Sequence, residues 1–194
     1  MAQLDEATDY GSVDWEFKSL RAHQYLYLLE ISLKDMLRIG QKITPIKKFM
    51  DLMQEASIEA KTAYSRGEVP VGAVAVYQNK IIARTYNRKE ELQDPTAHAE
   101  ILALQQTSKY LDSWHLEEVD FYVTLEPCPM CAYALLQARV RRLIFGAPDP
   151  KAGAAGSVIN IVQDKRFNHQ LEVTSGILEK ECRLILQKFF QGRR

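Results

Sequence analysis

The stretches DPTAHAEI (residues 94–101) and YVTLEPCPMC (residues 122–131) decide how this chain folds and what it does. The first contains a His-x-Glu pair, His98 and Glu100, and the second ends on a Cys-x-x-Cys pair that follows a strand-like run. Each pair alone is a weak signal, because either one has several ordinary explanations. Together they supply one imidazole and two thiolates, a ligand set that tetrahedral zinc accepts.

A catalytic zinc ion has three protein ligands and one open position for water. We expect His98, Cys128 and Cys131 to be these ligands, because two cysteines at a helix start can turn toward one point and the helix dipole favours their anionic form. No further cysteine or histidine stands at a convincing spacing to close the site. Glu100 is then the candidate general acid and base that carries the proton of water to a leaving nitrogen.

Helices and strands alternate around these motifs, which predicts an α/β domain with a three-layer α/β/α arrangement and a five-stranded mixed sheet. The expected strands are 71–77, 81–86, 121–125, 142–146 and 171–174. The expected helices are 46–66, 97–109, 129–138, 157–163 and 175–191, with Asp94 or Thr96 available to cap the second. We expect the first two strands to form an antiparallel hairpin and the last strand to follow a helical crossover, which would make it parallel.

Residues 1–45 form an N-terminal extension of unknown role. A helix is expected from about residue 15 to residue 39, and Gly40 and the Thr44-Pro45 pair are expected to break it. The remaining residues, 46–194, form the domain that carries the zinc motifs.

Composition narrows the class of protein. The 25 basic and 25 acidic residues leave no net charge, so overall charge does not make the chain a general nucleic-acid binder. Three cysteines without a secretory signal argue against a disulfide framework, and Cys182 lies in an apolar stripe at helical spacing, as a buried packing thiol would. No apolar run approaches the roughly 20 residues that span a membrane, so we expect a cytoplasmic protein with no membrane partner.

Several stretches outside the zinc motifs carry a more specific signal. These are Val69-Pro-Val-Gly-Ala73, Asn87-Arg88, Lys151-Ala-Gly-Ala-Ala-Gly-Ser157, Asn168-His169, Phe189-Phe190 and Arg193-Arg194. With the two zinc motifs they resemble the bacterial tRNA-specific adenosine deaminase family over about residues 46–194. The His-Ala-Glu and Pro-Cys-x-x-Cys motifs are shared by many zinc deaminases, whereas the Gly/Ala-rich loop and the C-terminal ending are more specific.

This resemblance implies a cytidine deaminase-like fold and a homodimer with one Zn²⁺ in each subunit. It implies that the partner is a tRNA anticodon stem-loop and that the wobble adenosine of an arginine tRNA becomes inosine. Zinc-bound hydroxide would be the nucleophile and ammonia the product, with no nucleotide cofactor. The substrate-binding residues carried over from the family are Asn87 for the base, Val71 and Leu125 for its two faces, Asp149 for the sugar or backbone, and Phe189, Arg193 and Arg194 for the RNA loop.

Three alternatives remain open at this point. A related deaminase could act on free guanine or on a pyrimidine nucleotide, although such an enzyme needs no Phe-Phe…Arg-Arg ending. A non-catalytic zinc scaffold could bind tRNA or a partner subunit, although Glu100 would then have no purpose. Zinc could also serve only to stabilise the fold.

Overall fold

The computed structural model describes the backbone of residues 33–192 and the side chains of residues 46–192. Its internal contacts divide the chain into two units, Met1–Pro45 and Ile46–Arg194. Most of the helix expected from residue 15, and the terminal Arg193 and Arg194, lie outside the described residues. Within the described part, no helix is both long enough and apolar enough to cross a membrane.

A five-stranded sheet with the strand order β2-β1-β3-β4-β5 forms the centre of the second unit. Its strands are β1 (Gly72–Tyr77), β2 (Lys80–Tyr86), β3 (Val119–Leu125), β4 (Arg142–Ala147) and β5 (Glu172–Thr174). Strand β1 pairs antiparallel with β2 and with β3, whereas β3–β4 and β4–β5 are parallel pairs. The predicted mixed sheet and its parallel last strand are therefore confirmed.

The β1–β2 hairpin closes through Gln78 and Asn79, whose φ angles are 47° and 64°. Two consecutive positive φ angles are typical of the turn whose twist matches that of the two strands it joins. A register shift between Ala75 and Val76 adds a bulge to the pair. The predicted hairpin is confirmed.

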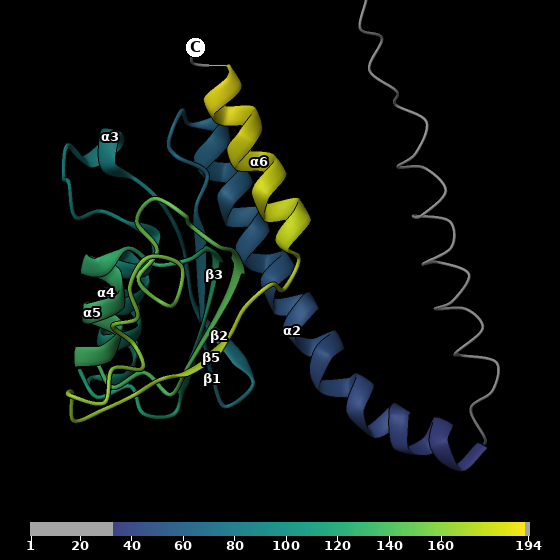
Figure 1. The fold of residues 1–194 in the computed structure, drawn as a ribbon. Coiled ribbons are helices and arrows are strands. Elements are labelled where there is room, and N and C mark those ends of the chain that lie inside the picture. Colours follow the sequence, from purple (N-terminus) through teal and green to yellow (C-terminus); the bar gives the residue numbers. More distant parts are fainter. Residues whose placement is uncertain (1–32, 193–194) are drawn as a thin grey trace, which may run out of the picture. The chain divides into compact units, whose positions relative to one another are not determined.

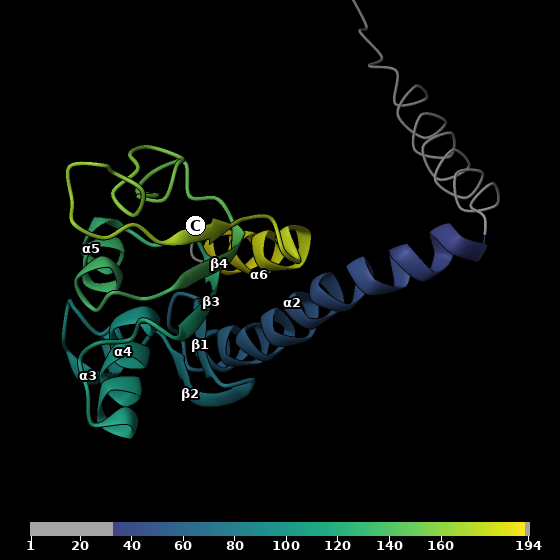
Figure 2. The ribbon, with the colours of Figure 1, turned by 90° about the horizontal axis from the view of Figure 1, so that it is seen from below.

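Helices cover both faces of this sheet (Figure 1). The helices of the described residues are α2 (Leu33–Ser65), α3 (Lys89–Leu92), α4 (Ala99–Leu111), α5 (Pro129–Gln137) and α6 (Glu179–Gln191). Helices α4 and α5 lie on one face, while α6 and the part of α2 from residue 46 onward lie on the other, as the turned view in Figure 2 also shows. The three-layer α/β/α arrangement is confirmed.

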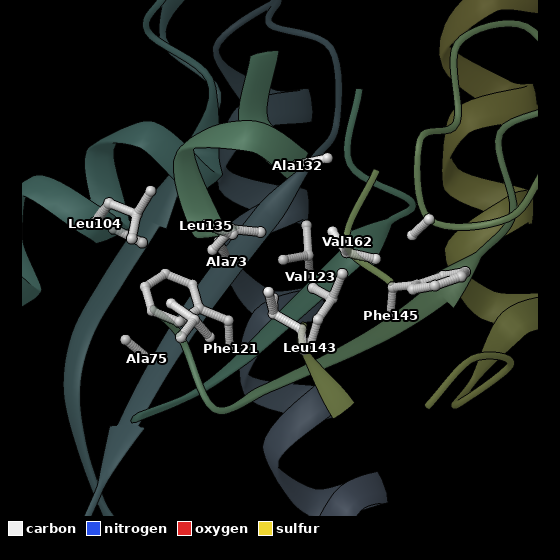
Figure 3. Packing of buried hydrophobic residues seen from close by; sticks show 14 of the residues in the cluster. Ala73, Ala75, Leu104, Phe121, Val123, Ala132, Leu135, Leu143, Phe145 and Val162 are labelled. Atoms are coloured by element: carbon white, nitrogen blue, oxygen red, sulfur yellow. The ribbon is translucent and has the colours of Figure 1, made fainter. Parts of the chain in front are cut away.

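Strand β3 separates two hydrophobic clusters because its side chains alternate between the faces of the sheet. Phe121 and Val123 join the cluster beneath α4 and α5, with Leu135 among their neighbours (Figure 3). Tyr122 points to the opposite cluster, where it meets Met53 of α2 and residues of α6. A one-residue slip of β3 would exchange the side chains of the two clusters, so their packing specifies the register of the strand.

Helix α2 runs through Gly40, Thr44 and Pro45, so the predicted break there is wrong. A glycine costs a helix about 1 kcal/mol relative to alanine, and a proline removes one backbone hydrogen bond. Both weaken a helix without forbidding it.

The connection from β4 to β5 differs from the prediction as well. Residues 157–163 form turns and an isolated bridge between Ala155 and Asn160, so the helix predicted there is wrong. Strand β5 is nevertheless parallel to β4. Within this crossover, residues 148–171, the amides of Val158 and Ile159 bond back to the carbonyl of Gly153, and that of Ile161 bonds to the carbonyl of Ala154, which is not the i to i−4 pattern of a helix.

The ends of two helices also differ from expectation. Helix α4 begins after His98, and Asp94 does not cap it but accepts hydrogen bonds from the amide and hydroxyl of Thr96 at 2.8 and 2.7 Å. Helix α6 begins only at Glu179, after Leu178 in a left-handed conformation. The helix start at His98 matters most, because it sets the position of a predicted metal ligand.

Candidate active site

Two helix N-termini bring the predicted metal ligands together. His98 is the N-cap residue of α4, and Cys128 is the N-cap residue of α5, whose first helical position is Pro129. Proline suits that position because its missing N–H would have no partner there. Cys131 follows in the first turn of α5 and is fully buried. The sequence therefore places all three side chains at the positive ends of helix dipoles.

The three ligand atoms have the spacing of a tetrahedral zinc site. The Nδ1 atom of His98 lies 3.7 Å from the Sγ atom of Cys128 and 3.5 Å from that of Cys131. Ordinary zinc–sulfur and zinc–nitrogen bonds at a tetrahedral angle put such atoms about 3.6 Å apart. Among the described residues, these three form the one group of histidine, cysteine and acidic side chains close enough to share a metal ion. The donor set fits zinc.

Protons within this group are distributed in favour of a thiolate. A hydrogen bond from Cys131 lowers the pKa of Cys128 to about 4, and His98 stabilises the same thiolate. The pKa of Cys131 is raised by its hydrogen bond to Cys128 and by burial. The hydrogen bond to Cys128 also raises the pKa of His98. A cation that binds here displaces these protons, since metal ligands must be deprotonated.

Glu100 lies in the first turn of α4, two residues after His98, and only 4% of its surface is exposed. Burial raises the pKa of its carboxyl group to about 7. A carboxyl group with a pKa near neutral can both accept and release a proton during one reaction cycle. The position predicted for the proton carrier therefore has the electrostatics that this role requires.

Backbone hydrogen bonds bring Asn87 and Val71 to the same region. The Asn87 amide donates to the Val71 carbonyl at 3.0 Å, and the amide of Arg88 donates to the carbonyl of Ala97, the residue before His98, at 3.0 Å. Gly72 in turn donates its amide to the hydroxyl of Thr124 at 3.1 Å. The end of β2, the start of β1 and the end of β3 are thus joined beside the metal ligands.

Glu68 is a residue that sequence reasoning missed. It follows α2, is 1% exposed, and accepts a hydrogen bond from the side-chain Nδ2 of Asn87 at 3.0 Å. Its other oxygen accepts the backbone amide of Glu91 at 2.8 Å. A glutamate before Val-Pro-Val gives no sequence signal of burial, because its partners lie 19 and 23 residues away.

An open pocket of about 630 Å³ lies between α6 and the start of the crossover. Leu125 and Asp149, both predicted substrate contacts, line it, and so do Lys151, Arg183 and Phe190. The ring of Phe189 is instead 6% exposed and packs edge-on against Tyr64 at 6.0 Å between centroids. Phe190, at 52% exposure, is the C-terminal ring that lines this pocket.

Glu126 holds the crossover in place through hydrogen bonds to its buried carboxylate. Its carboxylate accepts the amides of Asp149, Ala155 and Ser157 at 3.0, 2.9 and 3.0 Å, and also the Ser157 hydroxyl. Burial opposes its charge, but these hydrogen bonds outweigh burial, so the pKa of Glu126 is lowered. The side chain joins the strand that leads to Cys128 with the loop that carries Asp149.

Comparisons with known proteins agree on a family. The family model of MafB19-like deaminases matches residues 48–194. The tRNA-specific adenosine deaminase of Bacillus subtilis is 51% identical over 142 residues, which are 73% of this chain and 88% of that protein. The enzyme of the same name from Haemophilus influenzae is 47% identical over 149 residues, covering 76% of this chain and 86% of that protein.

A solved structure gives the same result. It comes from a study of A-to-I editing by tRNA:A34 deaminases at the wobble position of transfer RNA. The two chains are 46% identical, the TM-score is 0.68, and the match covers 70% of this chain and 99% of that one.

Proposed function

Because the chain belongs to the family of tRNA-specific adenosine deaminases, we propose that it converts the wobble adenosine of a tRNA anticodon to inosine by hydrolysis. The observation that carries the proposal is the meeting of His98, Cys128 and Cys131 with the buried Glu100 in a chain of this family. By resemblance the substrate is an arginine tRNA. Such a substrate accords with the cytoplasmic location expected from the sequence.

The proposed cofactor is one Zn²⁺ in each subunit, held by His98, Cys128 and Cys131. The support for zinc is the donor set and the spacing of about 3.6 Å that it requires. When bound, the ion lowers the pKa of water to about 7 and so supplies a nucleophile at neutral pH. The set of three ligands, rather than four, leaves a position for that water and favours catalysis over a purely structural role.

Glu100 is the proposed proton carrier. Its carboxylate takes a proton from the attacking water, whose oxygen adds to the amino-bearing carbon of the base. The carboxyl group gives this proton to the ring nitrogen. It then takes the second proton of the water from the newly formed hydroxyl group and gives it to the departing amine, so that a carbon–oxygen double bond forms while the carbon–nitrogen bond breaks and ammonia leaves. The pKa of about 7 for Glu100 supports this exchange in both directions at neutral pH.

The pocket beside α6 supports an RNA substrate. Asn87, Val71 and Leu125 are the proposed contacts of the target base, and Asp149 that of its sugar or backbone. Lys151 and Arg183 add positive charge where phosphates would pass, and the exposed ring of Phe190 offers a surface for base stacking. Phe189 is proposed to support Phe190 from behind, and Arg193 and Arg194 to extend the contact with the RNA loop.

The homodimer is proposed to form through α5 and the crossover. Met130 and Tyr133 of α5, and Val158 and Ile159 of the crossover, are apolar and between 36% and 54% exposed. The Tyr133 ring lies edge-on to Phe167 of the crossover at 5.6 Å, which joins these two segments. Exposed apolar side chains of this kind are typical of a subunit interface.

The deciding experiment is deamination of an arginine tRNA that carries adenosine at the wobble position, with inosine detected by sequencing. Free adenosine, cytidine and guanine are assayed beside it, and the Glu100→Gln variant is the protein control. We expect inosine at the wobble position alone, and only with the unaltered protein. Conversion of a free base without reaction of the tRNA would keep the hydrolytic chemistry and overturn the RNA substrate. No product from any substrate, despite bound zinc, would favour a scaffold.

A further inference from the structure

Glu68 is a buried carboxylate that the deamination chemistry does not use. It is 1% exposed, and each of its oxygens has a donor, the Nδ2 of Asn87 and the backbone amide of Glu91. Carboxylate oxygens only accept hydrogen bonds, whereas an asparagine amide has one end that donates and one that accepts. The contact can therefore form with only one orientation of the Asn87 side chain.

The two free positions of Asn87 are set by this contact. With Nδ2 turned to Glu68, the Oδ1 atom accepts no hydrogen bond from the part of the chain that the structure describes. Among those residues, Thr107 Oγ1 is the one fully buried side-chain oxygen or nitrogen atom without a partner. Asn87 Oδ1 also has no partner, so it is not fully buried and remains open to an incoming group. The second N–H of Nδ2 lies next to it on the same amide.

We propose that Glu68 is a positioning residue that fixes which way the Asn87 amide meets the target base. The inference rests on the proposed function, in which Asn87 contacts that base. An amide pairs with a base edge through an acceptor and a donor side by side, and the pairing has a direction. A reversed amide would place donor against donor and acceptor against acceptor, so the base would be refused at an intact metal site.

The backbone around this contact is rigid enough for such a role. Asn87 is 4% exposed, and its backbone N–H donates to the carbonyl of Val71. The second oxygen of Glu68 holds the α3 segment through Glu91, whose side chain pairs with Arg88 at 2.7 Å on the surface. Rotation of the Asn87 amide about its own bond is thus the remaining freedom, and Glu68 removes it.

The test exchanges the donor and the acceptor in the hydrogen bond between Asn87 and Glu68. In Glu68→Gln, the new amide oxygen keeps the Glu91 contact while the new NH₂ group faces Asn87, which must reverse its amide. Deamination of the anticodon stem-loop, measured as kcat/KM, should fall roughly 5- to 150-fold, the range that a bidentate amide–base pair is worth. Zinc content and melting temperature should stay near those of the unaltered protein.

The double variant Glu68→Gln with Asn87→Asp restores the hydrogen bond with donor and acceptor exchanged, and it again presents an oxygen to the base. It should exceed the single variant Asn87→Asp, which faces two carboxylates toward each other, by about tenfold in kcat/KM. This second comparison decides the matter even if Glu68→Gln does not fold. Glu91→Gln is the matched control, because it removes the side-chain charge that pairs with Arg88 and Arg66 but keeps the backbone donor to Glu68. It should retain nearly full activity.

Two results would overturn the assignment. They are full activity of folded Glu68→Gln, and a double variant no better than Asn87→Asp alone. A purely structural Glu68 would instead make activity follow the folded fraction in every variant. Failure of the proposed function is distinguishable, because the unaltered protein would then produce no inosine.

Discussion

Two buried glutamates 26 positions apart show how the same side chain serves opposite purposes in one molecule. Glu100, in the first turn of α4, is held by burial at a pKa of about 7. Glu126, directly after β3, is 2% exposed, yet four hydrogen bonds from the crossover lower its pKa. The difference lies in the donors around each carboxylate. At Glu126 the hydrogen bonds outweigh burial and keep the carboxylate charged, whereas at Glu100 burial outweighs the hydrogen bonds from its own backbone amide and from Cys131, so that this group remains ready to exchange a proton.

The largest expected effect tests the reactive member of this pair. Glu100→Gln keeps the size of the side chain but cannot carry a proton, so kcat should fall by about 10²- to 10⁴-fold. Zinc content, measured by atomic emission, and the melting temperature should change little. Retained turnover would mean that another group moves the proton and that Glu100 does not differ from Glu126 in its chemical role.

The next effect tests the fixed member. Glu126→Gln presents an NH₂ group to backbone and hydroxyl donors, so the free energy of unfolding should fall by about 1–3 kcal/mol. Because Asp149 then shifts relative to the zinc ligands, kcat/KM should fall about 10- to 100-fold, with zinc still bound. The matched control is Glu172→Gln, which removes an exposed pair with Arg142 and should cost less than about 1 kcal/mol. Equal losses of stability and of kcat/KM in the two variants would contradict the inference that the hydrogen bonds of Glu126 position the crossover.

A smaller effect probes the space around Glu126 without touching its charge. A Cβ atom at Gly153 would meet the Glu126 carboxylate and lie 2.6 Å from the Asp149 carbonyl oxygen. Gly153→Ala should therefore lower the free energy of unfolding by about 1–3 kcal/mol. Gly192→Ala is the control, since its Cβ atom would have ordinary contacts at 3.6 and 3.9 Å, and it should change stability by less than about 0.5 kcal/mol. Chemical denaturation of both variants measures the difference.

The smallest effect is the dependence of stability on pH. The pKa of Glu126 in the folded protein is below its usual value of 4.5, so its stabilising contribution is present above about pH 4.5 and is lost as the pH falls through the folded-state value. The difference in urea midpoint between the unaltered protein and Glu126→Gln should therefore be constant near neutral pH and should shrink below pH 4.5. A difference that grows in acid would have the wrong sign.

The sequence predicts most of the fold and the reactive half of the site. The alternating pattern is enough to place all five strands. Strands β1, β3 and β4 are buried on both faces and appear as short apolar runs between turn signals, while the partly exposed β2 follows a tight-turn signal. The grouping of His98, Cys128 and Cys131, the proposed zinc ligands, can also be predicted from the sequence, since each pair of motif residues lies within one helix start. These features are local along the chain.

The features that the sequence does not reveal are those made over long separations. Glu126 stands in the Leu-Glu-Pro-Cys stretch, but its partners lie 23 to 31 residues later. The helix expected at 157–163 is absent because the amides of Val158, Ile159 and Ile161 bond back to the carbonyls of Gly153 and Ala154, a loop pattern that the local sequence does not signal. Phe189 had a usable signal, since its spacing from Cys182 places it on the buried stripe of α6, which leaves Phe190 as the exposed ring.

One consequence concerns how the crossover opens. The amides of Asp149, Ala155 and Ser157 share a single acceptor group, although they lie at separate points of an irregular segment. When the Glu126 carboxylate moves out of hydrogen-bond distance, the three amides lose their acceptor at the same time. Their hydrogen–deuterium exchange should thus have one common protection factor, so that this helix-free loop behaves as a single cooperative foldon.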